Sequence, residues 1–270
     1  MRRNTMHSAA RCSPAQSARG RRVGLSLLAV MLFLPLTGCV YWRLNQFRRQ
    51  LSAFPDFFHI KEGTQPTVVA RQPVLRPDDL GWLSGLAASE FQEANGRARE
   101  IYQYIKQPPD PGTPGEPAPF DIVIDLVFNA QQRLEEVELP LRFAPVITSE
   151  NFEEVFRPMK DGRLAHADHA TDWFWEEHRV QIPVRGDIEH FLGPPRTSEQ
   201  VDGAWVYHYG YLLAGNTQRW NPTEWDLAIQ FQFGPEEEEE KVVYAEVFMG
   251  RIQVQVDLRG KQNRVQIKRL

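Results

Sequence analysis

The sequence predicts an α+β fold of two tandem units, in each of which short helices pack on an antiparallel β-meander. Two observations favour this fold. Part of the chain repeats itself at an offset of 105 residues, and the repeated segments alternate apolar and polar residues with the period of two that is typical of strands. In addition, each repeat opens with a short segment that starts near Pro or Asp and stops at Gly, as many helices do.

The clearest match lies between Phe120–Phe128 and Trp225–Phe233, where apolar residues coincide at every second position. Asp121 and Asp226 are identical in this match. Because a one-residue slip would exchange the buried and exposed faces of a strand, a shared phase at a fixed offset carries structural information. The other matched features are Tyr102-Gln103-Tyr104 with Tyr207-His208-Tyr209, Val137 with Val242, Phe143 with Phe248, and Phe47 with Phe152.

Each unit is expected to run from a helix into three or four strands. In the first unit these are a helix between Pro77 and Gly85 and strands through Tyr102 and Tyr104, over Phe120–Phe128 and over Leu134–Leu141, with a hairpin over Phe57–Leu75 before them. In the second they are a helix between Arg185 and Gly193 and strands over Trp205–Tyr209, Trp225–Phe233, Lys241–Met249 and Ile252–Leu258. The predicted domain boundaries are a leader at 1–38, a first unit at 39–146 and a second at 147–270.

The first 38 residues have the pattern of a secretory signal. Six arginines and no acidic residue precede and flank an apolar run, Val23 to Leu36, which is shorter than the roughly 20 residues of a membrane-spanning helix. Leu36-Thr37-Gly38-Cys39 resembles the lipobox of bacterial lipoproteins, which implies cleavage before Cys39 and acylation of its thiol. The alternative is an ordinary signal followed by a chance cysteine. Val40, in place of an Asp, implies the outer membrane by the same resemblance, with the protein facing the periplasm.

Charge and cysteine content exclude several classes of function. The chain has 31 basic and 35 acidic residues, and without the six arginines of the leader 25 basic residues remain, a net charge of about −10. That excess of acid argues against nucleic acid as a partner. Of the two cysteines, Cys12 lies in the leader and Cys39 is the predicted lipid site, so none remains for a disulfide or a thiol nucleophile.

The second unit resembles the BamE/SmpA/OmlA family of outer-membrane lipoproteins. The resemblance is carried by Ile188–Pro195, by Asp202–Tyr209 and by the strand ending at Phe233: a helix that stops at Leu-Gly-x-Pro, a Trp/Tyr strand and a meander. It covers about 70 residues of this unit and, more weakly, the first. It implies a small protein that supports assembly of outer-membrane β-barrels. The duplication and the length depart from the family, and tandem copies of a similar fold also occur in β-lactamase inhibitor proteins.

One candidate binding site is the aromatic run Trp173, Phe174 and Trp175. Three consecutive aromatic side chains cannot all face one core, so at least one is expected at a surface, where aromatic residues often anchor partners. Packing between the repeats is the alternative. The loop Gln107–Pro119, rich in Pro and Gly, is a second candidate, with a tolerated insertion as the alternative.

No catalytic or metal site is predicted. The cluster His166, Asp168, His169, Glu176, Glu177 and His178 matches no zinc signature, and a solvated connection explains it better than a metal site does. Asp121 and Asp226 are expected to be turn or sheet-edge devices rather than catalytic carboxylates, and Glu236–Glu240 a solvated hairpin tip. The chain lacks the sequence motifs of nucleophile elbows and phosphate loops.

The sequence therefore favours a non-enzymatic outer-membrane lipoprotein, without cofactors, that is anchored to the membrane at Cys39 and binds another envelope protein, with assembly or maintenance of that membrane as the expected role. The alternative is a lipid-anchored inhibitor or ligand-binding module that uses a concave tandem sheet. A metal-dependent hydrolase built on the histidine cluster is a third, weaker hypothesis.

Overall fold

The structure is a computed structural model that describes residues 40–61, 63, 65–108, 118–160, 163–165, 170–175, 182–216, 225–234, 240–259 and 263–270. The chain divides into two units, Met1–Trp42 and Arg43–Leu270. Of the first unit, residues 40–42 are described and are helical. The second unit contains the sheet, the cores and the cavity.

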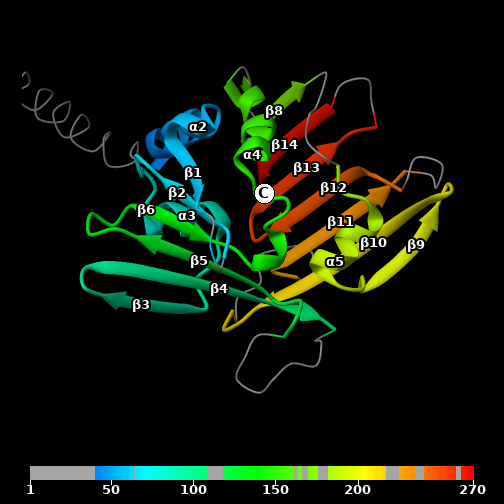
Figure 1. Cartoon of the computed structure of the whole chain (residues 1–270), viewed down its shortest axis with the longest axis horizontal. Helices are drawn as coiled ribbons and strands as arrows, with labels where there is room; N and C mark the ends of the chain where they lie inside the picture. The colour runs from blue at the N-terminus through cyan, green and yellow to red at the C-terminus, as the bar shows by residue number, and fades with distance from the viewer. Residues whose placement is uncertain are drawn as a thin grey trace, which may run out of the picture. The chain divides into compact units, whose positions relative to one another are not determined.

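In the described part of the second unit, fourteen strands form one antiparallel sheet (Figure 1). The strands are β1 (Phe58–Lys61), β2 (Thr67–Ala70), β3 (Glu90–Ala94), β4 (Arg97–Gln107), β5 (Ile122–Phe128), β6 (Leu134–Glu138), β7 (Arg163–Ala165), β8 (Ala170–Trp175), β9 (Thr197–Val201), β10 (Ala204–Leu213), β11 (Leu227–Phe233), β12 (Val242–Met249), β13 (Ile252–Asp257) and β14 (Asn263–Arg269). Their order is β1-β2-β6-β5-β4-β10-β11-β12-β13-β14-β8-β7, with β3 paired to β4 and β9 paired to β10.

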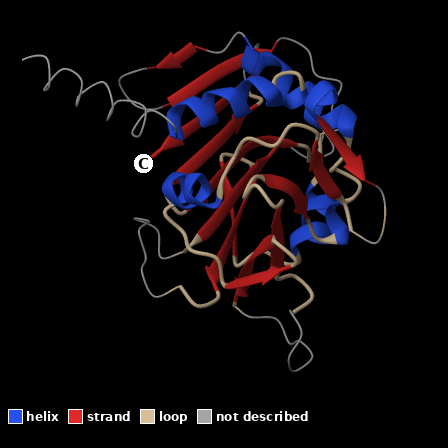
Figure 2. Ribbon diagram, turned by 90° about the vertical axis from the view of Figure 1, so that its left-hand side faces the viewer, coloured by secondary structure: helices blue, strands red, loops and turns tan. Residues whose placement is uncertain are grey.

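Short helices pack on this sheet (Figure 2). They are a helix over residues 43–51, α2 (Phe54–Phe57), α3 (Pro77–Ser84), α4 (Ser149–Phe156) and α5 (Arg185–Leu192), with 3₁₀ turns η1 (Leu141–Phe143) and η2 (Arg157–Lys160). The helices α3 and α5 end at Gly85 and Gly193, as the sequence predicts. Among the described helices, none has the length and apolar character needed to cross a membrane.

The predicted fold class, two tandem α+β units of short helices on separate meanders, is wrong. The structure is dominated by one continuous sheet, because β4 and β10 pair directly: Gly210 lies opposite Gln107, and Leu213 opposite Tyr104. Both strands are long and extend beyond their hairpin partners, so their free lengths can pair with each other. Arg43–Leu270 form one compact unit. The boundaries 39–146 and 147–270 were drawn from the sequence repeat, and they stay a prediction.

The order of elements is nevertheless similar on the two sides of the β4–β10 junction. A helix, a hairpin and two further strands follow one another as α3, β3–β6 and again as α5, β9–β12. The repeated aspartates occupy comparable places. Asp121 accepts a hydrogen bond from the amide of Lys106 at 3.0 Å, and Asp226 accepts one from the amide of Leu213 at 2.8 Å. Both are buried and accept backbone amides at the end of a central strand, which matches a turn role and not a position at the sheet edge.

The main core is built from tyrosines that the two central strands contribute to one face of the sheet. Tyr104 and Tyr211 are 1% and 0% exposed, and Tyr209 belongs to the same cluster. Burial raises the pKa of Tyr104 and of Tyr209, so both phenols stay protonated and uncharged. Tyr207 donates to Glu189 of α5 at 2.7 Å, and burial followed by this hydrogen bond raises its pKa to about 12.

A buried ion pair fixes the helix over residues 43–51 to α3. The guanidinium of Arg43 donates to both carboxylate oxygens of Asp79, from Nε at 2.6 Å and from Nη2 at 2.5 Å. Asp79 is 0% exposed and also accepts the amide of Arg76 at 2.9 Å, which caps the start of α3. The carboxylate of Asp79 thus accepts a backbone amide at the start of α3 and also holds Arg43 of the helix over residues 43–51.

We predict that Arg43→Leu destabilises the fold by about 3–5 kcal/mol, because it leaves the Asp79 carboxylate buried without its cation. The free energy of unfolding, measured by urea denaturation, tests this. The double variant Arg43→Leu/Asp79→Leu should recover part of the loss. A cost for the single variant below about 1 kcal/mol, as for exposed pairs, would show that the pair does not fix the helix.

Candidate functional site

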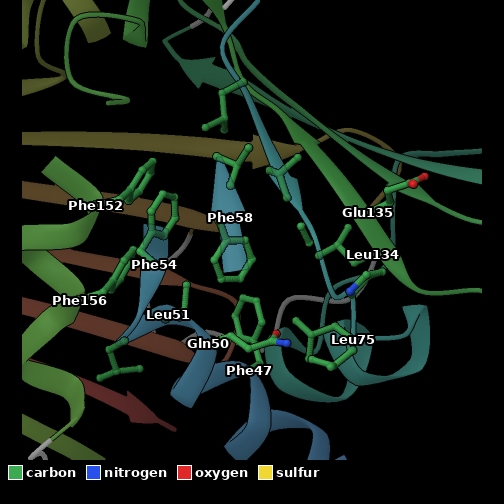
Figure 3. A pocket seen from close by; sticks show the side chains of 17 residues that line it. Phe47, Gln50, Leu51, Phe54, Phe58, Leu75, Leu134, Glu135, Phe152 and Phe156 are labelled. Carbon is green, nitrogen blue, oxygen red and sulfur yellow. The ribbon is translucent and has the colours of Figure 1, made fainter. Parts of the chain in front are cut away.

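The most distinctive site in the described residues is an apolar cavity of about 340 Å³ between the helices and the sheet (Figure 3). Its walls come from the helix over residues 43–51, α2, α4 and the strands β1, β2, β6 and β14. The lining residues are Phe47, Gln50, Leu51, Phe54, Phe58, Val68, Ala70, Pro73, Val74, Leu75, Leu134, Glu135, Val137, Leu139, Phe152, Phe156 and Ile267.

The cavity exists because the sheet curls. β2 and β6 lie near one end of the strand order and β14 near the other, yet residues of all three strands line the same space. Sheets of many strands curl in this way, since each strand is twisted relative to the next. The helices over residues 43–51, α2 and α4 occupy the space between the two ends.

Helical periodicity brings the aromatic side chains to the cavity. Phe47 and Leu51, and likewise Phe152 and Phe156, are four residues apart and lie on one face of their helices. Phe54 stands at the centre: its ring stacks on Phe58 and on Phe152 with centroids 5.1 Å apart in each case. Figure 3 shows Phe54 between α4 and β1. Rings at this distance gain energy beyond their buried area.

The polar groups of the lining are few and already bonded. Gln50 is 3% exposed and donates from Nε2 to the carbonyl of Gln72 at 2.8 Å. Glu135 accepts from Arg97 at 2.9 Å in a partly exposed pair. The lining therefore offers mainly apolar contact, which suits an apolar ligand.

A second hollow of about 490 Å³ lies between the β1–β2 turn and the start of α4. Its walls are mixed, with Lys61, Thr148, Ser149 and Glu150 beside Ile60, Pro66, Leu141 and Ile147. The apolar cavity is the better candidate, because its walls come from more elements and are more completely apolar.

The residues singled out by sequence fall elsewhere. Trp173, Phe174 and Trp175 lie on β8, opposite Val265, Arg264 and Asn263 of β14, and only their backbone is described. Cys39 and the cluster of His166, Asp168, His169, Glu176, Glu177 and His178 lie outside the described residues, as does most of the loop Gln107–Pro119. Their roles therefore stay predictions. Within the described residues, no group of three or more His, Cys, Asp or Glu side chains is placed to hold a metal.

Sequence reasoning missed the cavity-lining phenylalanines as a site. It recognised that Phe47 and Phe152 fall 105 residues apart but treated both segments as irregular or helical connections. The available signal was the four-residue spacing of Phe152 and Phe156, and of Phe47 and Leu51, which is typical of an apolar helix face.

Comparisons with protein-family models, with curated proteins and with solved structures find no match for this chain.

We predict that Phe54→Ala destabilises the protein by about 3–5 kcal/mol, because it removes a buried ring that stacks on two others and enlarges the cavity. Denaturation with guanidinium chloride measures the loss. Phe91→Ala, in an exposed strand position of β3, is the control and should change stability little. An equal effect of both variants would contradict the packing role of Phe54.

Proposed function

We propose that this chain is a non-enzymatic, lipid-anchored protein of the bacterial envelope that binds the hydrocarbon chain of a lipid in its apolar cavity. The observation that carries the proposal is the cavity itself: about 340 Å³, with apolar walls from seven elements. That volume lies at the lower end of the roughly 300–1,000 Å³ typical of small-molecule sites. A slender apolar ligand fits it better than a bulky or polar one.

The envelope location is part of the proposal and rests on the leader and on the lipobox-like Leu36–Cys39. An acyl anchor at Cys39 would hold the protein at a membrane, where single hydrocarbon chains are abundant. The resemblance to the BamE/SmpA/OmlA family supports the same location. It covers α5, whose C-terminal Gly193 has a positive φ of 71°, and the β9–β10 hairpin.

A ligand-binding module is favoured over an enzyme inhibitor that grips its target with the concave face of the sheet. The face that lines the cavity is covered by the helix over residues 43–51, α2 and α4, so it does not offer a broad surface. Binding of a protein in outer-membrane assembly or maintenance is a second candidate. It is favoured by the hairpins β3–β4 and β9–β10, whose first strands are exposed along their whole length and carry Phe91 and Val201 at 58% and 44% exposure.

The ligand proposal is tested by photolabelling of the full chain in lipid vesicles that contain a diazirine-bearing palmitic acid. Peptides with Phe54 and Phe152 should be labelled. Ala70→Phe, which places a ring in the cavity, should reduce that labelling about tenfold, the equivalent of roughly 1.4 kcal/mol. Ala94→Phe, at an exposed end of β3, should leave it unchanged. Labelling spread over the whole surface, or equal in both variants, would refute an internal site.

The anchor is tested separately by Cys39→Ser. This change should abolish acylation and leave the protein uncut or soluble, because the acylated thiol is lost. Mass spectrometry of the N-terminal peptide and density-gradient fractionation of envelopes measure both effects. If the variant still fractionates with the outer membrane, the lipoprotein hypothesis is wrong.

A further inference from the structure

The apolar cavity ends beside a group of arginines. Figure 3 shows Leu75 and Leu134 together at the end of the cavity that lies away from α4. Both leucines line the cavity and are buried. Each is next in the chain to an arginine, Leu75 to Arg76 and Leu134 to Arg133. The apolar lining therefore gives way to cationic residues at this end.

The same end of the cavity reaches solvent. Glu135 lines the cavity here, and its side chain is 36% exposed. Its carboxylate pairs with Arg97 at 2.9 Å, so its negative charge is already matched. Arg76 is exposed as well. A polar headgroup at this end can thus stay in contact with water while a hydrocarbon chain lies inside the cavity.

Two hydrogen bonds hold the segments that carry the arginines side by side. The amide of Leu134 donates to the carbonyl of Leu75 at 2.8 Å, and Nη1 of Arg133 donates to the carbonyl of Val74 at 2.6 Å. The residues just before α3 are thereby tied to the start of β6. The second bond uses one N–H donor of the Arg133 guanidinium and fixes the position of the group, which carries further donors.

Positive charge is in excess at this place. Arg43, Arg76 and Arg133, which we call the arginine cluster, act on one another around the buried carboxylate of Asp79, and Asp79 already holds Arg43 by two hydrogen bonds. Desolvation by burial, followed by the charges of Arg76 and Arg43, lowers the pKa of Arg133, and the attraction of Asp79 opposes this shift. An anion beside Arg133 would offset the repulsion between the arginines.

We infer that the arginine cluster binds the anionic headgroup, a carboxylate or a phosphate, of a single-chain lipid whose hydrocarbon chain lies in the cavity. This inference rests on the proposed lipid-binding function and names the class of lipid. Guanidinium groups donate parallel hydrogen bonds to the oxygens of carboxylates and phosphates, which makes arginine well suited to both. Arg76 and Arg133 are the groups that contact the headgroup, and Arg43, which is bonded to Asp79, adds its charge.

Other ligands match the two neighbouring surfaces less well. A hydroxyl headgroup accepts hydrogen bonds but does not offset the charge of the arginines. A zwitterionic headgroup brings a second cation to them. An anion without a hydrocarbon chain gains only contacts with partly exposed charges, which are weak in water. A hydrocarbon chain that ends in an anion satisfies the apolar cavity and the arginine cluster together.

Photolabelling of the full chain in lipid vesicles tests the inference with three probes that share one diazirine-bearing chain and carry a carboxylate, a phosphate or a hydroxyl headgroup. The two anionic probes should label the peptides with Phe54 and Phe152 about tenfold more than the alcohol, in line with hydrogen bonds to a charged group. Arg76→Gln/Arg133→Gln should remove this preference and leave labelling by the alcohol unchanged. Arg259→Gln is the matched control, since Arg259 pairs with Asp257 at 2.7 Å outside the cavity lining.

Thermal midpoints separate loss of binding from loss of fold. If the double variant is destabilised, Arg76→Gln alone keeps the bond between Arg133 and Val74 and should still lower the preference severalfold. Equal labelling by all three probes, or an equal preference in the wild type and in the stable arginine variant, would refute the headgroup site and leave the lipid-binding proposal standing. The site would also be refuted if inorganic phosphate at the concentration of the probe abolished the preference, because the chain would then contribute nothing.

An absence of labelling of the cavity peptides by every probe, the alcohol included, would refute the proposed lipid-binding function and this inference with it. The two failures are therefore distinguishable in one experiment. Ala70→Phe should reduce labelling by all three probes alike, because it fills the cavity and leaves the arginine cluster in place.

Discussion

The direct pairing of β4 with β10 is the constraint on which the rest of the structure depends. It joins strands from the two halves of the chain into one sheet, and it places Tyr104 and Tyr211 in a single buried core. A sheet of this size can curl far enough for β2 and β14 to line the same cavity, which two separate meanders could not do. The apolar site is therefore a consequence of the junction and not of either half alone.

The two faces of the sheet have opposite chemistry because side chains alternate along every strand. On β11 and β12, Ile229 and Val247 face the core, and their neighbours Gln230 and Glu246 face outward. An apolar interior and an amide-lined exterior can bind chemically different ligands without interfering with each other. The sheet gives each face the rigidity that precise binding needs.

Local patterns predicted much of the secondary structure but not its assembly. β11 and β13 alternate apolar and polar residues, β5 is a nearly continuous apolar run, and the sequence located all three. It missed β3 and β9, because strands exposed along their whole length have no apolar period; only the turns Asn95-Gly96 and Asp202-Gly203, with positive φ, mark them. The β4–β10 pairing has no local signal, since it depends on strand lengths and a shared core. The cavity depends on that pairing, so its phenylalanines could be seen as helix faces but not as one site.

The junction also has a consequence for how the chain reaches its native state. Residues 104–107 must meet residues 210–213, so the central pairing closes a loop of more than 100 residues. Contacts so distant in sequence are slow to form, because much chain entropy is lost before they contribute. Until they form, the free lengths of β4 and β10 present unpaired backbone groups that can join strands of other molecules. The free lengths of β4 and β10 are therefore the segments of this fold most open to pairing with other molecules before the junction closes.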